Sequence, residues 1–166
     1  GRDGYLRKAN KGELDIMGKN VPKYHPDQKL YLGGEGMIAS SDGYADFLRL
    51  LLNGGILNGH RFLNESTIKN MITSVDTQDG YGISTNFGLY ITGDSTVAQK
   101  KGDKGLWQGG GYEGTSFWID PKREFVGLLM TQVNQSPDHS GLGSGLYDKF
   151  RGLLYEQIFS HEKNTN

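Results

Sequence analysis

The run Gly109-Gly110-Gly111 is the part of this sequence whose residue types and spacing most clearly leave room for chemistry. It stands just before Thr115 to Ile119, whose side chains alternate with the period of two of a pleated strand. Glycine at such a place often marks the close approach of a ligand or of another backbone. The alternative interpretation is a bulge or bend that leads into the strand.

Two glycine patterns have the letters of nucleotide-binding loops but lack their context. The pattern Gly109-x-Gly111-x-x-Gly114 matches the dinucleotide fingerprint, yet a strand pattern follows it where the fingerprint needs a helix. The segment Gly141 to Gly145 does precede a helix pattern, but it lacks the Lys and Ser/Thr of a phosphate loop. No later strand completes a βαβ unit. We therefore expect a surface loop at this segment and no cofactor.

The segment Ser66-Thr67-Ile68-Lys69 has the spacing of a serine nucleophile and a lysine base. On a helix, Ser66 and Lys69 lie one turn apart on the same face, so a desolvated neutral lysine could accept the serine proton. The neighbouring residues Asn64, Glu65 and Asn70 are polar, which indicates an exposed and charged lysine. We predict a surface helix start rather than a catalytic pair.

The histidines do not form a recognisable site. His139 stands between Asp138 and Ser140, but residues adjacent in sequence cannot supply the spatial geometry of a catalytic triad. The other three histidines stand alone without the spacing of metal ligands, so we expect no metal; they are His25, His60 and His161. The chain has no cysteine, which excludes disulfides and thiolate chemistry.

Length and composition set the class of protein. At 166 residues the chain is long enough for one domain with a hydrophobic core. A net charge of −1 and a pI near 6.5 give no electrostatic footprint for nucleic acid or for an anionic membrane. No run approaches the ~18 apolar residues that span a bilayer. The 26 glycines are the outlier, about twice the usual share, and predict many tight turns or close backbone contacts.

Two helices and a hairpin are predicted in the first half of the chain. Ser40 or Ser41 is expected to cap a helix that ends at Asn53-Gly54-Gly55. Its apolar face consists of Tyr44, Phe47, Leu48, Leu51 and Leu52. Asn58-Gly59 predicts a two-residue hairpin turn. A second helix is expected to begin at Asn64, with Leu63 and Ile68 spaced as a hydrophobic staple.

Three strands and a last helix are predicted in the second half. The strands cover Tyr81–Thr92, residues 115–119 and Phe125–Met130. A turn at Asp120-Pro121-Lys122-Arg123 joins the second strand to the third. The third strand is apolar on both faces, so we expect it to lie inside a sheet that is covered on both sides. The lysine-bearing connection from Ser95 to Lys104 is expected to be a solvated loop. The buried stripe expected for the last helix is Leu146, Phe150, Leu153, Leu154 and Ile158.

The order of these elements predicts an α+β fold, an antiparallel sheet flanked by helices. We expect residues 1–166 to form a single partial domain, in which residues 1–32 are an irregular lead-in.

Three segments in order resemble the C-terminal half of the serine β-lactamase-like family, which includes class C β-lactamases, DD-peptidases and related esterases. GGEGMIASSDGYADFLRLLLNGG resembles the family's glycine loop and long helix, and LNGHRFLNESTIKNM resembles its short hairpin and following helix. GLWQGGGYEGTSFWIDPKREFVGLLMTQ resembles the strand pair bearing the third active-site motif. The resemblance covers Gly33 to Gln132 well and the last helix loosely.

The resemblance also implies what this chain lacks. In the family, the nucleophile motif Ser-x-x-Lys and a Tyr-x-Asn motif precede the glycine loop, and nothing before Gly33 provides either. Ser66 falls after the loop, where the family has no catalytic serine. We therefore expect no catalytic residue in this chain, which would be a fragment, a proteolytic product or one chain of a two-chain protein.

The third motif, Lys, His or Trp followed by any residue and Gly, fits this sequence in two registers. An ungapped count puts Gly109-Gly110-Gly111 on the motif and implies that the N–H of Tyr112 is an oxyanion donor. Two inserted residues put Trp107-Gln108-Gly109 there and imply the N–H of Gly110. Neither register places a lysine at the motif, so the cation that would pair with a substrate carboxylate is absent.

The resemblance thus implies part of a serine hydrolase that forms an acyl-enzyme. Its substrate would be a small ester or amide, with β-lactams and D-amino-acid peptides within the family's range. The alternative is a catalytically inactive binding or scaffold module of the same fold. We expect association with the missing N-terminal segment or another chain, no nucleic acid and no membrane span. The resemblance alone favours a periplasmic or extracellular location.

Overall fold

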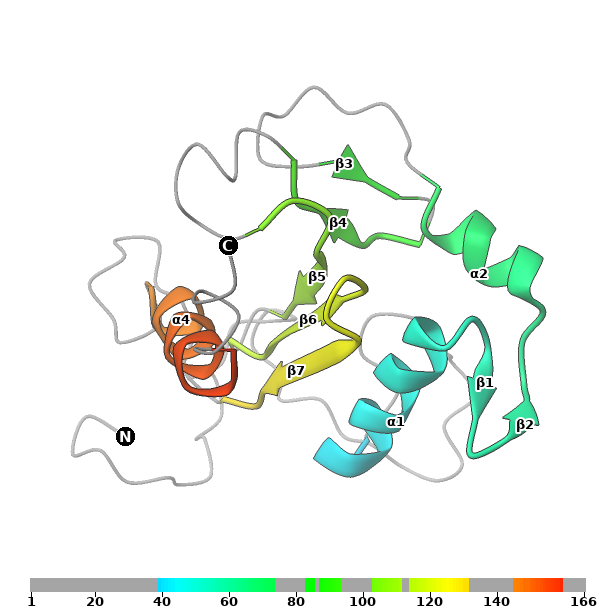
Figure 1. The fold of residues 1–166 in the computed structure, drawn as a ribbon, viewed down its shortest axis with the longest axis horizontal. Coiled ribbons are helices and arrows are strands. Elements are labelled where there is room, and N and C mark those ends of the chain that lie inside the picture. The colour runs from blue at the N-terminus through cyan, green and yellow to red at the C-terminus, as the bar shows by residue number, and fades with distance from the viewer. Residues whose placement is uncertain are drawn as a thin grey trace, which may run out of the picture. The chain divides into compact units, whose positions relative to one another are not determined.

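The computed structural model describes residues 39–73, 83–85, 87–93, 103–111, 114–131 and 145–159. The chain divides into two compact units, residues 1–39 and 40–166, and the account below concerns the second. The predicted lead-in over residues 1–32 lies outside the described residues. The described elements combine helices with antiparallel strands, so the α+β prediction is confirmed (Figure 1).

Helix α1 spans Ser41–Leu52 and begins and ends as its sequence predicts. Of the two candidate caps, Ser40 is the N-cap, because its hydroxyl accepts a hydrogen bond from the N–H of Gly43 at 3.1 Å. The helix stops at Asn53, and the following Gly54 has a φ of 61°, which glycine adopts without a Cβ penalty. The predicted apolar face is also confirmed: Leu48 and Leu51 are buried, and Tyr44, Phe47 and Leu52 pack against the same cluster.

A hairpin and a short helix follow α1. Strands β1 (Ile56–Leu57) and β2 (His60–Arg61) pair antiparallel around Asn58 and Gly59, whose φ angles are 51° and 79°. Both angles are positive, as the two-residue turn requires. Helix α2, Glu65–Met71, has Asn64 as its N-cap residue. Ile68 is buried in the same cluster as the α1 leucines, and Leu63 packs against it, so both staple residues reach the core.

The main sheet of the described residues has five antiparallel strands in the order β3-β4-β5-β6-β7. Their bounds are Ile83–Ser84, Tyr90–Ile91, Trp107–Gly110, Ser116–Asp120 and Phe125–Leu129. The predicted turn at Asp120 joins β6 to β7, and Pro121 follows the strand directly. β7 is the last strand of this order, so the prediction that it lies inside the sheet is not met in the described part of the chain. Its apolar residues instead meet a helix on each face.

The single strand predicted over Tyr81–Thr92 is wrong, because β3 and β4 form a hairpin there. The hydroxyl of Thr85 accepts hydrogen bonds from the N–H groups of Phe87 and Leu89, and Gly88 takes a φ of 77°. A threonine hydroxyl that bonds nearby backbone in this way favours a turn over a continued strand. The apolar alternation over Phe87, Leu89 and Ile91 therefore spans a turn and a strand.

The two faces of the sheet carry different helices, as the alternation of side chains along β6 shows. Phe117 and Ile119 belong to the hydrophobic cluster under α1. Trp118, between them in sequence, instead contacts rings of α4, a helix over Leu146–Ile158. Figure 1 shows α1 and α4 on either side of β6 and β7. At β6 and β7 the sheet is thus covered on both faces.

The predicted buried stripe of the last helix is only partly right. Phe150 packs against Trp118, but Leu153 and Ile158 are 52% and 48% exposed. The face turned to the sheet carries Tyr147, Arg151 and Tyr155 instead. These residues follow a period of four and have polar tips, which match polar side chains on the sheet. Hydrophobicity alone therefore identified only part of the helix face that meets the sheet.

Candidate active site

Strand β5 carries the glycines that the sequence singles out, and it is regularly paired rather than bulged. Gly109 pairs with Phe117 and Gly110 pairs with Ser116. The N–H of Gly111 donates to the carbonyl of Thr115 at 2.7 Å and continues the ladder. The pairing leaves no bulge at Gly109 or Gly110, but the predicted bend into the next strand is present at Gly114, which has a φ of 82° and whose N–H donates to the carbonyl of Gly111 at 3.0 Å. β6 follows in place of the helix that a dinucleotide fingerprint requires.

The hydrogen bond of Gly111 fixes which backbone groups of β5 face outward. In an antiparallel ladder, alternate residues direct N–H and C=O toward the same neighbouring strand. Gly109 and Gly111 therefore direct their groups toward β6. Gln108 and Gly110 direct theirs toward β4. By the same alternation, an oxyanion donor on the outer edge of this strand has to come from an even-numbered residue.

The outer edge of β5 is open at Gly110 in the part of the chain that the structure describes. β4 pairs with β5 only at Ile91–Trp107 and Tyr90–Gln108, and beyond Tyr90 the chain enters the β3–β4 turn. Gly110 itself is exposed. Its N–H thus points past the end of β4 and makes no hydrogen bond to a described residue.

The ring of Phe117 occupies the space where a side chain of Gly109 would stand. A Cβ placed on Gly109 would lie 2.7 Å from Cζ and 2.8 Å from Cε1 of that ring. Trp107, on the same face of β5, packs against the core cluster under α1. The sequence predicts that a ligand or another part of the protein comes close to the glycines. At Gly109 the group that comes close is the side chain of Phe117.

The opposite face of β5 is held by α4 through Gln108. The side-chain oxygen of Gln108 accepts hydrogen bonds from the hydroxyl of Tyr147 at 3.2 Å and from Nη1 of Arg151 at 3.1 Å. Arg151 is buried, pairs with Asp148 at 3.0 Å and lies 4.7 Å from the centre of the Tyr147 ring. Burial raises the pKa of Tyr147, although the charge of Arg151 opposes the shift. Helix α4 thus holds Gln108, the residue that precedes the glycines, in place.

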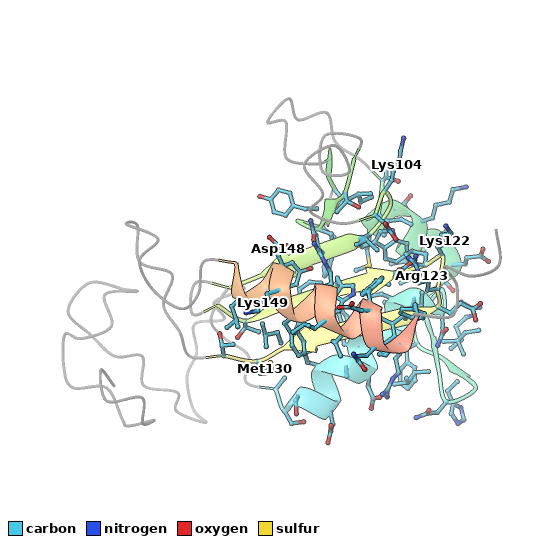
Figure 2. All side chains as sticks on the ribbon, turned by 60° about the vertical axis from the view of Figure 1, so that its left-hand side comes forward. Lys104, Lys122, Arg123, Met130, Asp148 and Lys149 are labelled. Atoms are coloured by element: carbon cyan, nitrogen blue, oxygen red, sulfur yellow. The ribbon has the colours of Figure 1, made fainter. Side chains whose placement is uncertain are left out.

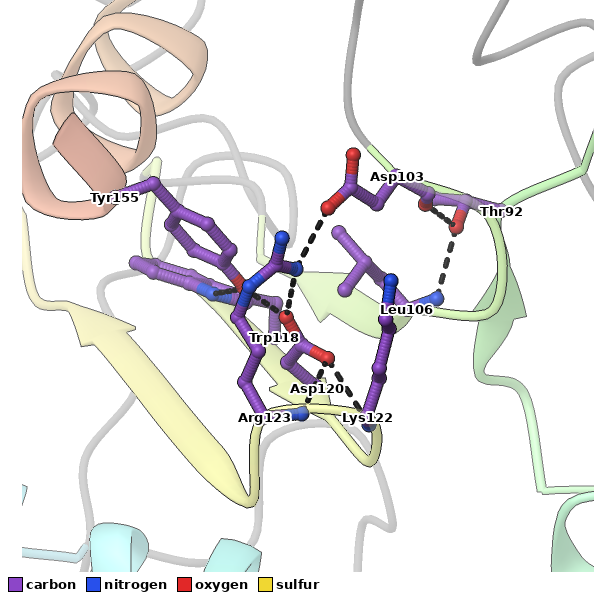
Figure 3. A network of polar contacts seen from close by, with 8 residues as sticks. All are labelled: Thr92, Asp103, Leu106, Trp118, Asp120, Lys122, Arg123 and Tyr155. Atoms are coloured by element: carbon purple, nitrogen blue, oxygen red, sulfur yellow. Dashed lines mark hydrogen bonds and ion pairs between the residues drawn. The ribbon is translucent and has the colours of Figure 1, made fainter. Parts of the chain in front are cut away.

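A second polar network joins α4 to the other end of the sheet (Figure 3). Asp120, 1% exposed, accepts hydrogen bonds through Oδ1 from the N–H groups of Lys122 and Arg123, both at 3.1 Å. Its Oδ2 accepts from the Arg123 guanidinium at 3.0 Å and from the hydroxyl of Tyr155 at 2.8 Å. Tyr155 in turn accepts from Nε1 of Trp118 at 3.1 Å. This buried carboxylate therefore has satisfied acceptor sites and a structural role.

Arg123 extends this network to the chain that leads into β5. Its guanidinium pairs with Asp103 at 2.6 Å and lies over the rings of Tyr155 and Phe159, 5.2 and 5.4 Å from their centres. The hydroxyl of Thr92 donates to the carbonyl of Asp103 and accepts from the N–H of Leu106. Figure 2 shows Arg123 at one end of α4, with Asp148 and Lys149 at the other end. The network thus anchors the start of β5.

The remaining sequence candidates do not form a site. Ser66 and Lys69 are both exposed on α2, as predicted for a surface helix start. His60 is exposed on β2, whereas His25, His139 and His161 lie outside the described residues, as do Tyr112 and Gly141–Ser144. Among the described residues, no group of three or more His, Cys, Asp or Glu could hold a metal ion. None of the described helices combines the length and apolarity needed to cross a bilayer.

Sequence reasoning missed the residues that support β5 and the turn after β6. Gln108 could have been recognised, because alternation puts it on the opposite face from Trp107. Tyr147, Arg151 and Tyr155 recur every four residues, a helical signal of a polar seam. No local signal distinguishes the buried Asp120 from an ordinary turn aspartate.

A family model described as Beta-lactamase matches residues 2–145 of the chain. No match was found among curated proteins.

Proposed function

Since this chain belongs to the Beta-lactamase family, we propose that it is the C-terminal part of a serine hydrolase and supplies one wall of the active site. The observation that carries the proposal is the outward N–H of Gly110 on the open edge of β5. A preorganised backbone donor of this kind is what acyl transfer needs where negative charge develops on the carbonyl oxygen. The nucleophile, its lysine and the tyrosine would come from a segment outside these 166 residues.

In this mechanism the wall acts on the carbonyl group of the substrate. The serine Oγ of the other segment attacks the carbonyl carbon and passes its proton to the base, while the carbonyl oxygen becomes an oxyanion. The β5 N–H donates to that oxygen. Collapse of the intermediate releases the alcohol or amine, which takes the proton, and leaves an acyl-serine. Water then attacks the acyl-serine by the same route and releases the acid.

Two residues are candidates for the role of donor: Gly110 satisfies the alternation of β5, and Tyr112 lies outside the described residues. In the register with Trp107 at the third motif the donor is Gly110, and in the ungapped register it is Tyr112. Gly109 and Gly111 direct their N–H groups into the sheet, which supports excluding them from the role.

The substrate we propose is a neutral ester or amide. A lysine at the third motif would attract a substrate carboxylate, and neither register has one. At Gly109 a longer side chain would also collide with the ring of Phe117. This wall therefore offers an aromatic surface where a cationic one would be needed to bind β-lactams or peptides through a carboxylate.

The test compares this chain alone with the chain joined to the upstream segment that its gene encodes. We expect the chain alone to leave p-nitrophenyl acetate unhydrolysed. We expect the joined protein to hydrolyse it if the segment carries Ser-x-x-Lys followed by Tyr-x-Asn. An upstream sequence without these motifs, and a joined protein without turnover, would favour the alternative of an inactive binding or scaffold module.

A further inference from the structure

A row of four aromatic rings crosses the sheet on the α1 face at the level of the glycines. The Phe117 ring of β6 lies 5.6 Å from that of Tyr44, which lies 6.1 Å from that of Phe47, and both of the latter belong to α1. The ring of Phe47 lies 6.4 Å from that of Phe87 in the β3–β4 turn. We call these four residues the aromatic row.

The missing side chain of Gly109 lets the aromatic row pass over β5. Helix α1 packs on β6 and β7, whereas Phe87 belongs to the turn on the far side of β5 in the strand order. The row therefore has to cross β5, and the ring of Phe117 lies where a side chain of Gly109 would stand. An apolar surface thus borders the strand edge where Gly110 directs its N–H outward.

The row is exposed at the end nearest the open edge. Phe87 is 48% exposed, while Tyr44, Phe47 and Phe117 are only partly buried. Burial raises the pKa of Tyr44, so its hydroxyl stays neutral and the row carries no charge. The exposed apolar end is thus available to a bound molecule.

We propose that the aromatic row is the subsite for the acyl group of the substrate, and that it selects apolar acyl chains larger than acetyl. The inference rests on the proposed function. The acyl group stays covalently attached after the alcohol has left, so it needs its own surface beside the oxyanion donor. Phe87 and Phe117 are the specificity-determining residues, because they form the two ends of the row.

The experiment uses the joined protein and two esters of one alcohol, p-nitrophenyl acetate and p-nitrophenyl hexanoate. In Phe87→Ala we expect kcat/KM for the hexanoate to fall about tenfold more than kcat/KM for the acetate, the size of discrimination that apolar pockets achieve. Phe62→Ala is the matched control, since Phe62 is an exposed phenylalanine, at 64%, that follows β2 and is not in the row. Its hexanoate-to-acetate ratio should stay that of the parent protein.

The possible results distinguish a failure of the subsite from a failure of the proposed function. A joined protein that hydrolyses both esters but whose ratio is unchanged in Phe87→Ala would overturn the subsite and leave the proposed function standing. A ratio that changes equally in Phe62→Ala would also overturn the subsite. In a second pair of substrates, two hexanoate esters of different alcohols, a Phe87→Ala effect that depends on the alcohol more than on the acyl chain would place the row on the leaving-group side and contradict the proposal. A joined protein inactive on both esters would reject the proposed function and the subsite with it.

Discussion

The hydroxyl of Tyr155 donates to Oδ2 of Asp120 at 2.8 Å and joins the last helix to the buried end of β6. The same hydroxyl accepts from the indole N–H of Trp118 at 3.1 Å, so one oxygen satisfies two buried groups of the sheet. Trp118 is fully buried, and its ring lies over Gly127, where a Cβ would come within 2.1 Å of it. Packing and hydrogen bonding thus fix α4 at the same point.

Removing this hydroxyl should destabilise the domain. In Tyr155→Phe the indole N–H of Trp118 loses its acceptor and Asp120 loses a donor, and unsatisfied buried groups cost about 1–3 kcal/mol each. We expect a loss of about 1–3 kcal/mol in the free energy of unfolding, measured by urea denaturation. Tyr90→Phe is the control, since Tyr90 is 46% exposed, and it should change stability by less than about 0.5 kcal/mol. Equal stability of both variants would refute the role of the hydroxyl.

The same hydroxyl should make stability depend on pH in the alkaline range. Burial raises the pKa of Tyr155 above its ordinary value of 10.0, and the hydrogen bond to Asp120 and the charge of Asp120 add to the shift. A raised pKa means that the folded state holds the proton longer than the unfolded state does. Its contribution is therefore complete below pH 10.0 and is lost as pH rises above that value.

The measurement for this pH effect is denaturation of the parent chain and Tyr155→Phe between pH 8 and 11. The stability difference between them should be constant below about pH 10 and should shrink above it. The other tyrosines are common to both proteins and cancel in the difference. A difference that grows with pH would show that the sign of the shift is wrong.

The space over Gly109 should tolerate no side chain while Phe117 is present. Gly109→Ala places a methyl group against that ring and should cost about 1–3 kcal/mol of stability, as overpacking does. Gly111→Ala is the control, because nothing lies within 4 Å of a Cβ there. In Gly109→Ala with Phe117→Leu, part of the loss from the alanine should be recovered. A purely additive double mutant would mean that the two residues do not interact.

The two candidate oxyanion donors can be separated by proline substitution in the joined protein. Gly110→Pro removes the outward N–H at a strand edge, where proline is tolerated. If Gly110 is the donor, kcat should fall about 10²–10³-fold. Gly110→Ala places its Cβ at the same point, 3.0 Å from the carbonyl oxygen of Thr115, but keeps the N–H, so it controls for that contact and should lose far less activity. A large loss in Tyr112→Pro together with a small one in Gly110→Pro would assign the donor to Tyr112 instead.

Local patterns predicted the elements whose signals lie within a few residues. The cap at Ser40 and the Asn58-Gly59 turn depend on neighbours in sequence, and both are present. The two residues spaced as a staple, Leu63 and Ile68, both reach the core cluster. The Tyr81–Thr92 strand was wrong because alternation cannot show that Thr85 bonds the backbone of a turn. The hydrogen bonds of the Thr85 hydroxyl stabilise a turn there, although the apolar residues alternate as in a strand.

The site was harder to predict because it depends on contacts between distant residues. The glycines were recognised, but the ring over Gly109 comes from Phe117 across the hairpin. Likewise, the buried face of α4 is decided by Gln108 and Asp120 on the sheet, which turn polar-tipped residues inward. Strand alternation, once the pairing of Gly111 with Thr115 is known, fixes the direction of the donors. That pairing could not be read from sequence.

The most direct test of the central claim is labelling with a fluorophosphonate probe, which reacts with activated serines, followed by mapping of the labelled residue. We predict no label on this chain alone and a label on the upstream serine of the joined protein. Labelling of Ser66 in the chain alone, with turnover of p-nitrophenyl acetate, would contradict the account. It would mean that the exposed Ser66 and Lys69 of α2 form a catalytic pair and that the glycine wall does not depend on another segment.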